Sequence, residues 1–363
     1  MTRRTGGTLR RRPGSGTSGR ASGGARGGGG GRVIPWSSGR KRAGGGAAGA
    51  GGGDGDGTGH DGEKRAGGSG TVGGAVDFHL ASCIAAAKAA GRVLLEHWGR
   101  RATLAVKEKG RNDFVTVADR RAEEVVLRLL RARFPDHAIV AEESASESGA
   151  SGRGSSEGGA GGRSGSRATR DDRSAADGYR WFVDPLDGTT NFIHGVPLFG
   201  VSIGLADAQG MRAAAVYDPV RDEMFTAARG QGAHLNGTPL QVARPGKLER
   251  SLLVTGIPFR SLDRLDAYLA SFRGFIQEAG GLRRDGSAAL DLAYVACGRF
   301  DGFWEMGLSS WDVAAGSLLV TEAGGVVTDF TGRGGYVESG DIIASAPEIH
   351  PDMLRVVRAA YRK

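Results

Sequence analysis

Apolar residues recur at helical spacing where ordered structure is expected to begin, near residue 75. The positions that share one face of this predicted helix are Leu80, Ile84, Ala87, Gly91, Leu94 and Trp98. This spacing predicts an amphipathic helix of about six turns. The polar stretch 107–111 then predicts a mobile loop. A second helix is expected after Asp119, which suits the N-cap position, and Pro135 ends it. Its apolar stripe consists of Ala122, Val125, Val126, Leu129 and Leu130.

Short apolar runs broken by Gly, Pro and Asp predict strands. One run at 138–140 leads into Glu142-Glu143-Ser144, and another at 181–183 leads into Asp184. The region from 196 to 257 is β-rich, with runs at 201–205, 213–217, 223–227 and 252–255.

The C-terminal third alternates between the two kinds of element. Helices are expected at 262–280, 288–298, 311–323 and 351–361, and strands through Phe303-Trp304 and at 325–329 and 341–345. Because this alternation has no strict βαβ period, it predicts a layered α/β (α+β) fold rather than a simple doubly wound sheet.

Composition separates two low-complexity segments from this pattern. Residues 1–73 are Gly, Arg, Ser and Ala with few large apolar side chains, so we expect a disordered tail. Its first part, the Arg-rich and acid-free residues 1–53, also resembles an organelle transit peptide. Residues 145–178 have a similar composition and read as an insert in the domain that spans 74–363.

Charge and cysteine content narrow the classes of function. Residues 1–53 hold eleven Arg or Lys and no acid, so the chain's net charge of +8 leaves 8 − 11 = −3 for residues 54–363. The sequence therefore gives no reason to expect a nucleic-acid-binding surface on the folded part. Cys83 and Cys297 fit buried thiols of a reducing compartment, and we expect no membrane span and a cytoplasmic location, with a plastid or mitochondrion as the alternative.

The run Trp181-Phe182-Val183-Asp184-Pro185-Leu186-Asp187-Gly188-Thr189-Thr190-Asn191-Phe192 is the most informative one. It predicts a strand whose C-terminal end holds two carboxylates, followed by a Gly that lets the backbone approach an anion and open a helix. Taken alone, Asp187-Gly188 is equally typical of a β-hairpin turn.

Four acids lie at element boundaries: Glu142 after a strand, Asp184 and Asp187 in this turn, and Asp312 at the start of a helix. Packed together they would repel one another unless cations neutralised them. Oxygen ligands without His or Cys favour Mg²⁺. The turn would also aim the Leu186 carbonyl at the same cluster. Two such ions could bind a phosphate and activate a water for attack.

These residues carry a resemblance to a known family. Ala141-Glu142-Glu143-Ser144, the Asp184–Phe192 motif and Trp311-Asp312-Val313-Ala314-Ala315-Gly316 resemble, in this order, motifs of the inositol monophosphatase family, a group of lithium-sensitive, magnesium-dependent phosphatases. The resemblance covers about residues 75–360 and implies an αβαβα sandwich of the inositol monophosphatase and fructose-1,6-bisphosphatase type, commonly dimeric.

The resemblance also implies roles for single residues. The implied metal ligands are Glu142, Asp184, the Leu186 carbonyl, Asp187 and Asp312. Thr189 with Asp119 resembles the couple that orients the attacking water, and Gly188 and Thr189 would hold the phosphate through their N–H groups. The implied contacts to the polyol are Gly286, Ser287, Ala288 and Glu305, and Lys107 matches a residue of a mobile active-site loop. Without the family, Asp119 reads as a helix cap and Glu305 as a surface acid.

The sequence thus predicts Mg²⁺-dependent hydrolysis of a phosphate monoester on a small polyol, first of all inositol 1-phosphate. Histidinol phosphate, fructose 1,6-bisphosphate and nucleotide 3′-phosphates are alternative substrates of the same scaffold. An alternative of another class is a regulatory protein that uses the phosphatase fold as a binding platform, for example on a transcription complex. Nucleic-acid binding by the basic tail is a weaker alternative.

Overall fold

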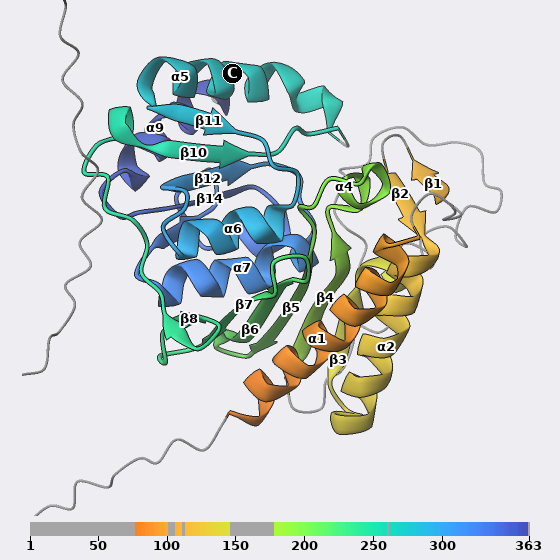
Figure 1. Ribbon diagram of the computed structural model, residues 1–363. Coiled ribbons are helices and arrows are strands. Elements are labelled where there is room, and N and C mark those ends of the chain that lie inside the picture. The colour runs from red at the N-terminus through yellow and green to blue at the C-terminus, as the bar shows by residue number, and fades with distance from the viewer. Residues whose placement is uncertain (1–76, 101–105, 111–112, 146–177, 260, 362–363) are drawn as a thin grey trace, which may run out of the picture. The chain divides into compact units, whose positions relative to one another are not determined.

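A computed structural model describes residues 77–100, 106–110, 113–145, 178–259 and 261–361, all within the compact unit Gly70–Lys363. Side chains before Thr116 are described only for residues 77–100. The predicted tail at 1–73, and all but the first and last residues of the predicted insert at 145–178, lie outside the described residues. Within the unit, helices and sheets alternate in five layers (Figure 1).

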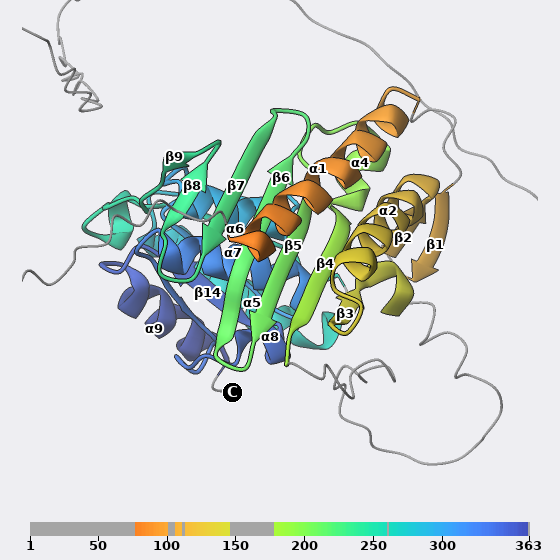
Figure 2. The same ribbon diagram turned by 90° about the horizontal axis from the view of Figure 1, so that it is seen from below.

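The first layer is a pair of helices, α1 (Phe78–Trp98) and α2 (Val117–Arg133), which pack on the first sheet. That sheet has seven strands in the order β3-β4-β5-β6-β7-β8-β9, and only the β3–β4 pair is parallel (Figure 2). Its strands are β3 (Ala138–Ala141), β4 (Arg180–Asp187), β5 (Gly200–Asp207), β6 (Gly210–Asp218), β7 (Glu223–Ala228), β8 (Ala233–Leu235) and β9 (Thr238–Pro239).

The central layer consists of α6 (Ala288–Ala296) and α7 (Ser310–Glu322), which lie between the two sheets. The second sheet has the order β11-β10-β12-β14-β13, parallel among its first three strands and antiparallel thereafter. Its strands are β10 (Leu252–Thr255), β11 (Gly281–Arg283), β12 (Gly302–Glu305), β13 (Val326–Thr328) and β14 (Ile342–Ser345). The last layer is α5 (Leu265–Glu278) with α9 (His350–Tyr361).

Three apolar clusters fill the spaces between these layers. One lies under α1 and α2, one surrounds α6 and α7, and one lies beneath α5 and α9. The layered αβαβα prediction is therefore confirmed. The remaining elements are short: the hairpin β1 (Val106–Gly110) with β2 (Asp113–Thr116), helices α4 (Thr189–His194) and α8 (Tyr336–Ser339), and 3₁₀ turns at Leu248–Arg250 and Leu262–Arg264.

Two local predictions were wrong. Residues 107–110 belong to strand β1, which pairs with β2, and do not form a loop. Asp119 is not the N-cap of α2, because the helix begins one turn earlier. Thr116 is the N-cap, and Asp119 is the third helical residue. The two form a capping box: the Thr116 side chain accepts the backbone N–H of Asp119, and the Asp119 side chain accepts the backbone N–H of Thr116.

The expectation that no segment could span a membrane also needs correction. By length and composition α1 is long and apolar enough to do so. However, its residues Ala86, Ala87, Ala90 and Leu94 are fully buried against the first sheet and α2, where α1 crosses β5 and β6 (Figure 2). This is the packing of a core helix.

Low pH should destabilise the packing of α9 on the second sheet, because His350 at the start of α9 is buried there. The residue is 6 % exposed, with Ser345 Oγ at 2.9 Å from its Nδ1 and Thr328 Oγ1 at 3.0 Å from its Nε2. Burial lowers its pKa from 6.5 to about 4. As pH falls, the unfolded chain therefore binds a proton first. The stability that His350 contributes is complete above pH 6.5 and is lost as pH falls toward 4, by about 2–3 kcal/mol.

Urea denaturation of the wild type and of His350→Gln between pH 7 and 4.5 measures this contribution. The difference in unfolding free energy between the two proteins should change by about 2 kcal/mol across that interval, to the disadvantage of the wild type at acid pH. A difference that does not vary with pH would contradict the assignment. Using the difference cancels the titration of all other groups.

Candidate active site

The turn after β4 has the geometry that its sequence predicts. β4 ends at Asp187, and Gly188 follows with a φ of 91°, where a Cβ would lie 3.0 Å from the Leu198 carbonyl oxygen. Both the positive φ and the close approach require glycine. The chain then enters α4 before it returns as β5, so the segment is not a tight hairpin (Figure 1). The β4–β5 register shifts between Asp184 and Asp187, which marks a bulge.

Three of the four predicted acids meet at this point. Ligand atoms of Asp184, Asp187 and Asp312 all lie within 4.8 Å of one another. They come from β4 and from the first turn of α7, which packs against β4 and β5. Glu142, which directly follows β3 beside β4, lines the same pocket. All but Asp187 are less than a tenth exposed.

Hydrogen bonds from the chain orient the three aspartates. Asp184 Oδ1 accepts the N–H of Leu186 at 2.9 Å. Asp187 Oδ2 accepts the Ser287 hydroxyl at 2.6 Å and the Ala289 N–H at 2.7 Å. Asp312 accepts the N–H of Ser309 at 2.8 Å within the capping box of α7. Each of these carboxylates is thus oriented through one of its two oxygens.

Crowding makes the cluster costly to ionise without a cation. Burial, and then the charges of Glu142, Asp187 and Asp312, raise the pKa of Asp184 well above its usual value of 3.8. Burial raises the pKa of Asp187 to about 6, although hydrogen bonds from Ser287 and Ala289 oppose the shift. A bound cation would reverse this effect, because it stabilises the ionised carboxylates.

A hydroxyl and a carboxylate lie beside the acids. Thr189 Oγ1 is 3.2 Å from Asp119 Oδ1 and 3.1 Å from the Leu186 carbonyl oxygen. Asp119 is fully buried, and burial raises its pKa to about 6. Since its Oδ2 accepts from Thr116, the two oxygens of Asp119 serve different partners.

One cavity of about 150 Å³ gathers almost all of the predicted site residues. Those that line it are Glu142, Asp184, Leu186, Asp187, Gly188, Thr189, Gly286, Ser287, Ala288, Glu305 and Asp312. Asp119 does not line the cavity, but its Oδ1 accepts a hydrogen bond from Thr189, which does. Glu143 is buried outside it, and the side chain of Lys107 lies outside the described residues.

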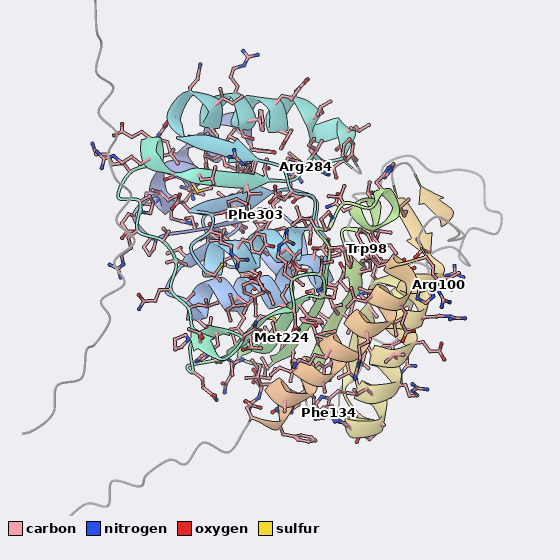
Figure 3. The ribbon with its side chains drawn as sticks, in the orientation of Figure 1. Trp98, Arg100, Phe134, Met224, Arg284 and Phe303 are labelled. Carbon is pink, nitrogen blue, oxygen red and sulfur yellow. The ribbon has the colours of Figure 1, made fainter. Side chains whose placement is uncertain are left out.

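Sequence reasoning missed Leu308 and four other residues that shape this cavity. Gly256, at the end of β10, leaves the space that the Glu305 carboxylate fills, since a Cβ there would collide with it. Arg284 directly follows β11 (Figure 3) and brings a cation to the wall, and Thr190 also lines it. Glu123 on α2 accepts the N–H groups of Glu143 and Ser144 at 2.8 and 2.9 Å and so fixes the turn that carries Glu142. Only Thr190, inside the motif, had a signal in the sequence.

The donor set fits a hard divalent cation. The lining residues offer carboxylates, a carbonyl and hydroxyls, and they include neither His nor Cys. Oxygen-only sites with several carboxylates suit Mg²⁺ and disfavour zinc or copper. The residues that would hold Mg²⁺ are the three clustered aspartates together with Glu142 and the Leu186 carbonyl.

Several known proteins are similar to this chain. The model of the inositol monophosphatase family matches residues 78–361. Nus factor SuhB of Pseudomonas aeruginosa is 46% identical over 275 residues, which are 75% of this chain and 93% of that protein.

Two solved structures are similar as well. The extragenic suppressor protein suhB from Bartonella henselae has a TM-score of 0.65 and 39% identity, covering 77% of this chain and 98% of that one. The inositol monophosphatase from Anabaena has a TM-score of 0.62 and 38% identity, covering 77% and 95%.

Proposed function

The chain belongs to the inositol monophosphatase family, and from this membership we propose that it hydrolyses phosphate monoesters of small polyols, first of all inositol 1-phosphate, with Mg²⁺. The observation that carries the proposal is the buried cluster of Asp184, Asp187 and Asp312 in one cavity with Glu142. When bound, Mg²⁺ would polarise the phosphate and lower the pKa of a water.

The other residues then have defined tasks. Asp119 accepts the Thr189 hydroxyl proton and so turns a lone pair of that oxygen toward the pocket, where it can orient the attacking water. The first N–H groups of α4, which have no partner within the helix, face the position of a phosphate in this proposal. Glu305 and the Gly286–Ala288 turn would contact the polyol hydroxyls.

Release of inorganic phosphate tests the proposal. With Mg²⁺, the protein should hydrolyse inositol 1-phosphate faster than histidinol phosphate, fructose 1,6-bisphosphate or a nucleotide 3′-phosphate, and a chelator should abolish the rate. A faster rate on another of these esters would overturn the choice of inositol 1-phosphate. No turnover of any of them would overturn the phosphatase proposal itself.

A second function is favoured by the names of the relatives. A protein 46% identical over 93% of its length is called a Nus factor, so we also propose that this chain acts as a partner in a transcription complex. This naming supports the binding-platform reading more directly than it supports inositol 1-phosphate as the substrate. Such a role would place the protein in the bacterial cytoplasm with its complex.

Capture on purified transcription complex separates the two functions. We expect Asp184→Asn to bind as well as the wild type while its phosphatase activity is lost, because the substitution lies inside the cavity. Asp263→Asn, on the exposed turn before α5, serves as the matched control. Absence of binding by the wild-type protein would refute the second function.

A homodimer remains a proposal, supported by an apolar stripe on the last layer. Leu262, Leu269 and Ile276 lie seven residues apart and are 38, 50 and 60 % exposed. Two copies packed antiparallel about Leu269 would pair Leu262 with Ile276 and bring Asp266 toward Arg273 of the other copy. Light scattering of the purified protein measures the mass directly.

A further inference from the structure

A buried glutamate on α2 uses both of its carboxylate oxygens to bind the turn after β3. Glu123 is 4 % exposed and does not line the acidic cavity. Its Oε2 accepts the N–H of Glu143 at 2.8 Å, and its Oε1 accepts the N–H and the hydroxyl of Ser144 at 2.9 and 2.5 Å. A glutamate is almost never buried to this extent unless its carboxylate is hydrogen-bonded, and here these three bonds meet that need.

The three bonds hold the chain where it leaves the edge of the first sheet. β3 is the edge strand, and its last ladder pair joins Ala141 to Val183. Residues 142–145 then form a helical turn. The first N–H groups of such a turn have no partner within it, and a negative charge is favourable at that end. Glu123 supplies both from another helix, so the turn is anchored to α2.

The anchored turn carries Glu142, which lines the acidic cavity. Its backbone is fixed on one side by the pairing of Ala141 and on the other by the bond from Glu143 to Glu123. Burial first, and to a smaller degree the nearby charge of Glu142, raises the pKa of Glu123. The two carboxylates therefore lie close enough to repel each other, and the hydrogen bonds keep the turn in place against this repulsion.

The same face of α2 holds a second part of the site. Asp119 lies four residues before Glu123, one helical turn away, and its Oδ1 accepts the Thr189 hydroxyl at 3.2 Å. Between them Ala122 is fully buried in the apolar cluster under α1 and α2, where α2 packs beside β4 (Figure 2). One helix thus binds the turn after β3 and the start of α4, and its position sets where Glu142 lies relative to Thr189.

We propose that Glu123 is a positioning residue of the metal site, which holds Glu142 where it can bind a cation together with the clustered aspartates. This inference rests on the proposed Mg²⁺-dependent function and adds to it a residue that touches neither the ion nor the substrate. Loss of such an outer partner typically weakens metal binding about 10- to 100-fold.

Metal binding is measured without substrate, through the loss of the paramagnetic resonance signal of free Mn²⁺. Glu123→Gln keeps the size of the side chain, but its amide has one acceptor oxygen, so the N–H of either Glu143 or Ser144 then faces an NH₂ group. We expect at least one Mn²⁺ to bind about tenfold more weakly. Glu124→Gln makes the same chemical change at the next residue, which is exposed, and should bind Mn²⁺ as the wild type does.

A double-variant cycle shows whether Glu123 acts through Glu142. Glu142→Gln by itself should weaken Mn²⁺ binding, and the addition of Glu123→Gln should then change the Kd by less than about twofold. If Glu123→Gln weakens binding as much in the Glu142→Gln background as in the wild type, Glu123 does not act by positioning Glu142.

Thermal unfolding in chelator separates positioning from a purely structural role. If Glu123→Gln unfolds at a lower temperature but binds Mn²⁺ with the wild-type Kd, Glu123 is only a cap of the turn, and the phosphatase proposal stands. If the wild type binds no Mn²⁺, the proposed metal site fails and the role of Glu123 with it. If Glu123→Gln does not fold, Glu123→Asp, whose carboxylate reaches about 1.5 Å less far, decides by the same measurement. An unchanged Kd in that variant overturns the inference.

Discussion

Replacing Asp184 with Asn is expected to lower kcat for phosphate release at least about a thousandfold, which corresponds to about 4 kcal/mol in barrier height. Asp184 is the aspartate whose pKa responds to Glu142, Asp187 and Asp312 together, so it lies at the electrostatic centre of the cluster. Asn has the same size and its carbonyl oxygen can still accept the Leu186 N–H. The change therefore removes one charge and one anionic ligand while the turn is kept.

The same variant should be more stable than the wild type when no metal is present. Removing one of several crowded charges relieves repulsion that the fold otherwise bears. Thermal unfolding with a chelator and with Mg²⁺ measures both effects. We expect Asp184→Asn to unfold at the higher temperature in chelator and to gain less from Mg²⁺ than the wild type does. Near-normal kcat at saturating Mg²⁺ would refute the role of Asp184, and Asp263→Asn should behave as wild type throughout.

Replacing Asp119 with Asn is the second change with a large expected effect. We expect kcat to fall about 10²- to 10⁴-fold, because an amide is neutral and has a single acceptor oxygen, so it cannot accept from both Thr189 and Thr116 as the carboxylate does. The same residue closes the capping box of α2, and losing a cap costs about 1 kcal/mol of stability. Activity measured at a temperature where the variant is fully folded separates these roles.

Variants of Thr189 give an independent check of this couple. Thr189→Ser keeps the hydroxyl and should retain most of kcat, whereas Thr189→Val keeps the shape and should lose as much as Asp119→Asn. The double variant should be little worse than either single one, since both changes break one unit. If Asp119→Asn loses stability but no activity, Asp119 is a helix cap only.

Local patterns predicted much of the fold. The stripe of α2 is visible in the sequence because Ala122, Val126 and Leu130 face the sheet while Arg121 and Arg128 face solvent. The central helix α7 shows no such stripe, since it lies between two sheets and is buried on every side from Asp312 to Val320. It could be recognised only by length and apolar content.

The errors have separate physical causes. Residues 107–110 are too polar to read as a strand, and pairing with β2 makes them one. Glu123 occupies a helix position that looks like a charged surface site, yet it is buried because it binds the turn after β3. The partners of Glu123 lie about twenty residues away, outside any local window, whereas β1 pairs with a strand only a few residues away, in a hairpin that its polar sequence does not reveal.

Much of the candidate site could be predicted because its residues belong to short segments with clear local signals. Asp184, Asp187 and Gly188 lie in one short turn whose conformation the sequence dictates, and Asp312 belongs to a capping box at a helix start. Convergence of these segments followed from the family resemblance. The contact of the Arg284 guanidinium with the Phe259 ring could not be predicted in either way, because Phe259 lies between β10 and α5 and Arg284 between β11 and α6.

Anomalous diffraction from crystals grown with Mn²⁺ in place of Mg²⁺ tests the central claim most directly. The proposal predicts strong peaks within coordination distance of Asp184, Asp187 and Asp312, with Glu142 at one of them, and loss of a peak in crystals of Asp184→Asn. Crystals that bind Mn²⁺ elsewhere and show no peak among these four carboxylates would contradict it.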